Sequence, residues 1–188
     1  MFSAAKRYWH IEIIGSLDKP FSWKRLFQKC RRYSRYRYVF WFRVAYVLNE
    51  QGNKFWRRRG KLLNEKLSRE YNVEIMLGAT IGEGLWIAHP NGIVITSHAQ
   101  IGKNFKIWQN STIGIKGLCN DVKLLIGDGV RVHAHACIIS DDLQLGDGAI
   151  IGAGTFLDKS VAAGHVAFNR RTTDVREYDT TSMGRLQQ

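Results

Sequence analysis

The segment Ile126-Gly127-Asp128-Gly129 returns as Leu145-Gly146-Asp147-Gly148 and again as Ile151-Gly152-Ala153-Gly154. These segments belong to a longer stretch, Ile75–Ala162, in which an aliphatic residue recurs every six positions, with three breaks. The recurring residues are Ile75, Ile81, Ile87, Ile95, Ile101, Ile107, Ile113, Ile126, Val132, Ile138, Leu145, Ile151 and Leu157. A repeat of six residues is typical of a parallel β-helix.

The geometry of a β-helix explains this period. Each short strand turns one aliphatic side chain inward, and the glycine that often follows lets the chain bend. Three strands close a triangular coil of about eighteen residues, and successive coils stack about 4.8 Å apart. One coil cannot bury its own aliphatic residues, so several must stack. Ordinary sheets with glycine-rich turns would place their strands about eight to twelve residues apart.

The three breaks in the period are candidate functional positions, because departures from a strong local rule tend to mark such sites. The first adds two residues around His89-Pro90-Asn91-Gly92. At the second, the spacing of thirteen residues predicts that Lys116–Lys123 leaves the coil as a loop. At the third, the spacing of seven predicts a bulge at Asp141-Asp142.

The sequence before the repeat predicts helices from Phe21 to about Tyr71. Ser22 is a candidate N-cap for the first helix, and four residues behind it share one helical face. These are Trp23, Leu26, Phe27 and Cys30. The apolar segment Phe40–Leu48 predicts a second helix. The basic segment Phe55–Tyr71 predicts a third helix. The apolar side of the third helix consists of Leu62, Leu63 and Leu67.

The chain therefore divides into three parts. Residues 1–71 form a basic, aromatic-rich α-helical region, of which residues 1–20 show no clear element. Residues 72–168 form the β-helix, and residues 169–188 form a polar C-terminal tail. The predicted fold class is mainly β, a parallel β-helix with an N-terminal α-helical segment.

Charge is distributed unevenly over these parts. Residues 1–71 carry 18 Lys and Arg against 5 Asp and Glu, which gives +13, whereas the rest of the chain is at −1. Basic residues mixed with Trp, Tyr and Phe suit an anionic membrane surface. The same composition is compatible with a helical cap on the end of the β-helix. Nucleic acid binding is the weakest of the three alternatives, and we expect no nucleic acid partner.

Two features bear on location. No run of eighteen apolar residues predicts a membrane-spanning helix, and no signal-peptide pattern stands at the N-terminus. Cys30, Cys119 and Cys137 are isolated and lack metal-ligand spacing, which fits a reducing compartment. We therefore expect a cytoplasmic protein, with peripheral contact to the inner face of the membrane as an option for residues 1–71.

Residues 72–161 resemble a known family. The resemblance is carried by Val73-Glu74-Ile75, Gly78–Gly82, Ile87–Ile95, Gln109–Gly114 and Ile151–Thr155. These segments are similar to the serine acetyltransferase group of hexapeptide-repeat acyltransferases, and within it they look closest to bacterial exopolysaccharide acetyltransferases of colanic-acid type. The resemblance implies a left-handed coil, a homotrimer, and acetyl transfer from acetyl-CoA to a hydroxyl group.

The same resemblance implies that His89 is the general base. Glu74, fifteen positions earlier, stands where the family has an Asp that orients this histidine. The chemistry agrees, because a neutral imidazole can take the proton of a hydroxyl near pH 7. A carboxylate on the other ring nitrogen would fix the tautomer. The alternative for His89 is a structural histidine in a turn.

Other candidates follow from register or from the resemblance. For the acceptor they are Gln109, Trp86, Trp108, Lys123, His133 and His135. For acetyl-CoA they are Gly114, Ala134, Gly152, Ala153, Arg170 and Arg171, although the closing Gly-x-Pro-Ala-Arg of the family is absent. His133 and His135 are expected to share a strand face, which could suggest a metal. No third ligand is placed by the sequence, so no metal is expected.

Two departures point the predicted acceptor away from serine. The family's second histidine is replaced at about Lys123, and its acidic N-terminal helical domain has no counterpart in residues 1–71. We therefore expect a sugar hydroxyl of a bacterial surface polysaccharide or a lipid-linked glycan. The alternatives are serine O-acetylation in cysteine biosynthesis and a noncatalytic scaffold with a membrane- or polyanion-binding arm. A metal-dependent hydratase, a further alternative, would need three convergent histidines.

Overall fold

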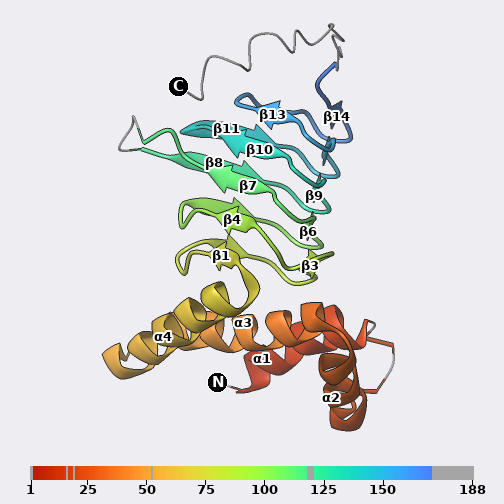
Figure 1. Cartoon of the computed structure of the whole chain (residues 1–188), viewed down its shortest axis with the longest axis vertical. Coiled ribbons are helices and arrows are strands. Elements are labelled where there is room, and N and C mark those ends of the chain that lie inside the picture. The colour runs from red at the N-terminus through yellow and green to blue at the C-terminus, as the bar shows by residue number, and fades with distance from the viewer. Residues whose placement is uncertain (1, 16, 19, 52, 118–120, 171–188) are drawn as a thin grey trace, which may run out of the picture.

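The chain forms a layer of helices at one end of a column of stacked coils (Figure 1). The computed structural model describes residues 2–15, 17–18, 20–51, 53–117 and 121–170. The column is a left-handed parallel β-helix, which confirms the predicted fold class. Its strands form three parallel sheets, one on each side of the coil.

The strands follow one another around the coil in a fixed order of sheets. The first sheet contains β1 (Val73–Ile75), β4 (Ile93–Ile95), β7 (Thr112–Gly114), β10 (Cys137–Ile139) and β13 (Phe156–Leu157). The second contains β2 (Thr80–Ile81), β5 (Ala99–Ile101), β8 (Lys123–Ile126) and β11 (Asp142–Leu145). The third contains β3 (Trp86–Ile87), β6 (Lys106–Ile107), β9 (Arg131–Val132), β12 (Ile150–Ile151) and β14 (Val166–Ala167).

The predicted register is confirmed. In the first sheet the aliphatic residues pair in the order Ile75, Ile95, Ile113, Ile138 and Leu157, so successive coils hold 20, 18, 25 and 19 residues. All thirteen recurring residues are buried. They fill the interior of the column, and their burial is the main source of its stability, at roughly 25 cal/mol per Å² of apolar surface.

A column of glycines at the corner between the second and third sheets explains the repeated Gly-Asp pair. A Cβ atom on Gly102 would lie 2.9 Å from the backbone nitrogen of Asp128. The Asp side chains use this close approach, because Asp128 Oδ1 accepts from the Lys103 amide at 2.6 Å. Asp147 Oδ1 likewise accepts from the Asp128 amide at 2.8 Å. Each carboxylate therefore ties its own coil to the neighbouring one.

Replacing Gly82 with alanine is expected to lower the free energy of unfolding by about 1–3 kcal/mol, the usual range for overpacking. The new Cβ would lie 2.7 Å from the Gly102 carbonyl oxygen, which is backbone and cannot rotate away. Gly114→Ala is the matched control, since its Cβ would meet only the end of the Ile139 side chain. Urea unfolding of both variants tests this, and an equal loss in both would contradict it.

The described part of the second break is a loop, as predicted. Residues 115–117, 121 and 122 lie outside the strands, whereas Lys123 already belongs to β8. Asp141 Oδ1 holds the base of this loop by accepting from the amides of Lys116 at 2.9 Å and Gly117 at 3.0 Å. At the third break Asp141 lies between β10 and β11, and its side chain is buried. The predicted bulge at Asp142 is wrong, because Asp142 begins β11 opposite Lys123.

Within the described part of the chain, four α-helices and one π-helix precede the column. They are α1 (Phe2–Trp9), η1 (His10–Ile14), α2 (Trp23–Arg32), α3 (Ser34–Glu50) and α4 (Lys54–Tyr71). Ser22 is the N-cap of α2, as predicted, and its side chain accepts from the Arg25 amide. The helices in residues 2–14 were not predicted, although Ala5, Trp9 and Ile13 are buried at a spacing of four.

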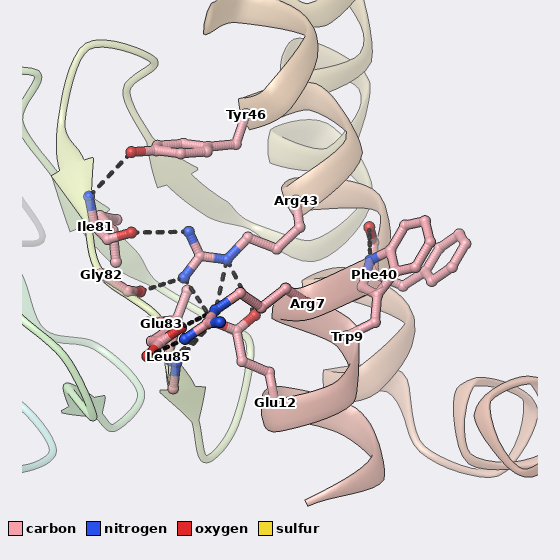
Figure 2. A network of polar contacts seen from close by, with 11 residues as sticks. Arg7, Trp9, Glu12, Phe40, Arg43, Tyr46, Ile81, Gly82, Glu83 and Leu85 are labelled. Carbon is pink, nitrogen blue, oxygen red and sulfur yellow. Dashed lines mark hydrogen bonds and ion pairs between the residues drawn. The ribbon is translucent and has the colours of Figure 1, made fainter. Parts of the chain in front are cut away.

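The helical layer covers the open end of the first coil (Figure 1). Tyr46 of α3 accepts a hydrogen bond from the Ile81 amide at 3.3 Å. Arg43, which interrupts the apolar run of this helix, is fully buried and pairs with buried Glu12 of η1 at 2.6 Å. Figure 2 shows that both side chains point to the backbone of residues 81–85. This network attaches two helices to the β-helix.

The four residues of the predicted face of the first helix lie on α2 but differ in burial. Leu26 is buried and Cys30 is half-buried, whereas Trp23 and Phe27, whose rings stack with centroids 5.9 Å apart, are exposed to solvent. Within the parts of the chain that the structure describes, no helix has the length and apolar character needed to cross a membrane.

Candidate active site

The candidate residues converge on one edge of the column, the corner where the third sheet passes into the first. This edge, here called the His89 corner, consists of the turns 88–92, 108–111, 133–136 and 152–155. Nine of the predicted residues lie there or at its border. They are Trp86, His89, Trp108, Gln109, His133, Ala134, His135, Gly152 and Ala153.

The two extra residues of the first coil present His89 to solvent. Ala88 is still held to the next coil by its amide, which donates to the Ile107 carbonyl at 3.0 Å. The chain then turns tightly, with the Asn91 amide donating to the His89 carbonyl at 2.9 Å. His89 is consequently exposed at the tip of the turn. A histidine in this position is open to a substrate and to a neighbouring subunit.

Two asparagines fasten this turn to the segment that carries Glu74. The Gly92 amide donates to the Asn72 carbonyl at 2.7 Å, and Asn72 Nδ2 donates to Asn91 Oδ1 at 3.1 Å. Asn72 has a left-handed backbone, with φ at 52°, and ends α4. Neither asparagine was among the predicted site residues, although Asn91-Gly92 is a familiar turn signal.

Glu74 lies in the middle of β1 with its side chain exposed. It is paired with Val94 of β4, the strand that follows the His89 turn. Among the described residues no hydrogen bond joins Glu74 to His89, so the predicted contact is not made within a single chain. Both side chains nevertheless project outward from segments that are bonded to each other.

Aromatic rings continue along the corner. Trp108 stacks on His133 with ring centroids 4.6 Å apart, and Trp86 meets Trp108 edge-on at 5.0 Å. The guanidinium of Arg35, from α3, lies 5.5 Å from the Trp86 ring. This contact brings the helical layer to the border of the candidate site, and sequence reasoning did not find it.

The two histidines of the third turn do not share a strand face, and that prediction is wrong. His133 follows β9, whereas His135 occupies a left-handed turn position with φ at 60°. The turn separates the two rings, and His135 faces Asn110, with Nε2 3.5 Å from Nδ2. Within the described ranges, no three His, Cys, Asp or Glu side chains are grouped to hold a metal ion.

Gln109 lies in the coil next to His89, and its turn is bonded to the His89 turn because the Asn110 amide donates to the Asn91 carbonyl at 3.0 Å. Gln109 Oε1 is buried and has no hydrogen-bond partner. Such an atom is costly unless a ligand or another group supplies a donor. Ala134 and Ala153 continue this edge, since the Gly154 amide donates to the Ala134 carbonyl at 2.9 Å.

The remaining candidates lie elsewhere. Lys123 begins β8 and Gly114 ends β7, so both are at the corner between the first and second sheets. Arg170 is exposed beyond β14, and Arg171 lies outside the described residues. One chain therefore does not bring Lys123 to the His89 corner.

Comparison with known proteins identifies related sequences. No family model matches the chain. It is 37% identical over 120 residues to mitochondrial serine acetyltransferase 3 of Arabidopsis thaliana. The aligned region covers 63% of this chain and 30% of that protein. It is 33% identical over 115 residues to serine acetyltransferase of Escherichia coli strain K12, covering 61% and 41%. The relatives are serine acetyltransferases.

Solved serine acetyltransferases also share its fold. The soybean enzyme complexed with serine matches at a TM-score of 0.64 and 30% identity, over 74% of this chain and 57% of that one. Isoform 3 of Entamoeba histolytica, complexed with cysteine, matches at a TM-score of 0.71 and 20% identity, over 98% and 63%. The chain thus spans about a third of the length of the Arabidopsis relative. It spans 57% and 63% of the length of these two solved structures.

These relatives overturn the expected polysaccharide acceptor. Both the curated relatives and the solved structures are serine acetyltransferases, so the prediction of polysaccharide O-acetylation is wrong and serine, the stated alternative, is favoured. The basic helical region had argued against serine. The Entamoeba structure, however, matches 98% of this chain and hence its helices too. Surface charge can change while a fold is kept, which is why charge misled the prediction.

Proposed function

We propose that this protein transfers the acetyl group of acetyl-CoA to the hydroxyl of L-serine, giving O-acetylserine and free CoA. The observation that carries the proposal is its similarity to serine acetyltransferases, including one solved with serine bound. The exposed histidine at the break in the repeat supplies a base of the kind that this reaction needs.

In the proposed mechanism His89 takes the proton of the serine hydroxyl as its oxygen attacks the thioester carbon. The tetrahedral intermediate then collapses, the C–S bond breaks, and the imidazolium returns the proton to the departing CoA sulfur. Glu74 is the proposed positioning residue, because a carboxylate near the other ring nitrogen favours the imidazolium. Backbone amides of the glycine-containing turns are available as donors to the developing oxyanion.

A homotrimer is part of the proposal. His89 and Lys123 lie at different corners of one chain, so a site that uses both needs a neighbouring copy. Lys123 would then offer an ammonium group to the carboxylate of serine, in place of the second histidine of the family. A closed ring of identical subunits repeats such a contact three times.

The small residues of the His89 corner are the proposed neighbours of acetyl-CoA. Ala134, Gly152 and Ala153 have small or no side chains, which lets a ligand that lies along the column approach closely. The side-chain oxygen of Gln109, which lacks a donor, is a ready acceptor for such a ligand. Gly114 would contribute from the other corner, and Arg170 and Arg171 would meet the CoA phosphates.

The direct test follows CoA release from acetyl-CoA with a thiol reagent. We expect release with L-serine, little release with L-alanine, which lacks the hydroxyl, and a product with the mass of O-acetylserine. The protein's own Cys30 should contribute little background, because burial raises the pKa of its thiol to about 11. Release that does not depend on serine, or no release at millimolar serine, would contradict the proposal.

A further inference from the structure

Exposed apolar side chains are concentrated in the helical region. Among the described residues, eight large apolar side chains in the helical region and five in the column are exposed. The eight are Leu17, Trp23, Phe27, Tyr33, Trp41, Phe55, Trp56 and Leu62. Single exposed apolar residues are ordinary, but a concentration of aromatic ones marks an interaction surface.

One group lies on α2 and is called here the α2 patch. Trp23 and Phe27 are 48% and 57% exposed, and their rings stack with centroids 5.9 Å apart. Helix α2 is anchored by Leu26, which is buried, and by Lys29 Nζ, which donates at 2.7 Å to a backbone carbonyl of η1. Trp23 also meets the buried Trp9 ring edge-on with centroids 6.0 Å apart, so the aromatic pair lies at the rim of an anchored helix with about half of its surface exposed.

A second group, the α4 patch, lies at the start of α4. All side chains of Lys54–Arg59 are exposed, and Phe55 and Trp56 are 53% and 40% exposed. Phe55 and Leu62 lie on one helical face with Arg58 and Arg59, and the four line a shallow crevice of about 270 Å³. The Arg59 guanidinium lies 5.3 Å from the Phe55 ring.

Charge selects the partner of these patches. Helix α2 contains no acidic residue, and neither does Lys54–Asn64 of α4. With +13 on residues 1–71, two copies of this surface would repel each other. A partner that matches both the basic and the apolar residues must be anionic and able to accept aromatic rings.

We propose that the α2 and α4 patches bind the surface of a bilayer that contains anionic phospholipid. Trp and Phe side chains favour the headgroup level, and Lys and Arg are attracted to anionic lipid. Figure 1 shows α2 projecting from the helical layer away from the column, with the start of α4 at the opposite end of the layer. The crevice beside Leu62 combines two apolar side chains with two arginines, which suits an acyl chain beside a phosphate headgroup.

The test is flotation of the full chain with vesicles of phosphatidylcholine alone or with about 30% phosphatidylglycerol. We expect binding only to the anionic vesicles, weakening as salt is raised. The variant R57Q/R58Q/R59Q should bind about a hundredfold more weakly, since each basic residue near the surface adds about a factor of five. W23A/F27A and F55A/W56A should each lose about tenfold. Serine-dependent CoA release should be unchanged in all three.

Phe156→Ala is the matched control, because Phe156 is 57% exposed but lies on β13, in the last full coil. Its vesicle binding should equal that of the unmodified protein. Equal flotation with neutral and anionic vesicles would overturn the proposal, as would an equal loss in F156A. Duplex DNA that displaces the protein from vesicles at equal charge concentration would also overturn it, in favour of a general polyanion site.

Discussion

Replacing Arg43 with methionine is expected to lower the free energy of unfolding by about 3–5 kcal/mol, the cost of removing one partner of a buried ion pair. Arg43 is fully buried, and its guanidinium donates to Glu12 Oε1 at 2.6 Å and to the Gly82 carbonyl at 2.6 Å. It also donates to the Ile81 carbonyl at 3.0 Å. Methionine fills much of the volume, but it leaves the two carbonyls without the Arg43 donor and Glu12 Oε1 with the backbone amides of residues 84–85 as its remaining donors (Figure 2).

The pH dependence of this variant should have a definite sign. Burial raises the pKa of Glu12, while Arg43 and the amides of Leu85 and Gly84 act in the opposite direction. Without Arg43 the pKa rises further, and the folded variant binds a proton that the unfolded chain has released. Its stability should therefore be highest at low pH and fall as the pH rises above the ordinary carboxyl pKa.

Urea unfolding of two further variants makes this test specific. Arg7→Met is the matched control, because Arg7 also pairs with a glutamate, Glu83, at 2.6 Å but its side chain is 65% exposed. Its loss of stability should be far smaller than that of Arg43→Met, because water screens an exposed ion pair. The double variant Glu12→Leu/Arg43→Met should recover part of the loss, since no charge remains buried. A loss of less than about 1 kcal/mol in Arg43→Met would refute the assignment of Arg43 and Glu12 as a stabilising buried ion pair.

Replacing His89 with alanine is expected to lower kcat for serine-dependent CoA release by about 10²–10⁴-fold, the usual contribution of a general base. Thermal unfolding should be unchanged, because the side chain is exposed at the tip of its turn. Glu74→Gln should also lower kcat, since it keeps the shape of the side chain but removes the charge that favours the imidazolium.

His165→Ala is the matched control for this experiment. His165 is likewise an exposed histidine in a turn, at the corner between the second and third sheets, where its Nδ1 lies 2.8 Å from the Ala163 carbonyl oxygen. It should keep its activity. Comparable rates for His89→Ala and the unmodified protein would rule out His89 as the base, whereas equal losses in both histidine variants would point to a general effect on the fold.

Asn72 shows where sequence reasoning about the site stopped. The break in the repeat correctly singled out the His89 turn, because an insertion in a strict period must leave the coil. Asn72 holds that turn through its carbonyl and side chain, yet it precedes the repeat and follows a helix. The role of Asn72 depends on stacking of the second coil onto the first, and the residues around Asn72 in the sequence do not predict that contact.

The repeat by itself determined the column. Its contacts join every third aliphatic residue of the repeat, so counting in threes from Ile75 to Leu157 predicts the pairings of the first sheet despite the three breaks. The cap at Ser22 and the basic helix ending at Tyr71 were also predictable, because both depend on neighbouring residues alone.

Only the tertiary structure decided how the helices meet the column. Glu12, Arg43 and residues 81–85 are far apart in the chain, and no local period links them. The interrupted apolar run of α3 predicted an exposed arginine as readily as a buried one. Its burial depends on a carboxylate and two carbonyls that converge when the helices close the first coil, because a buried charge is stable only where its partners are already in place.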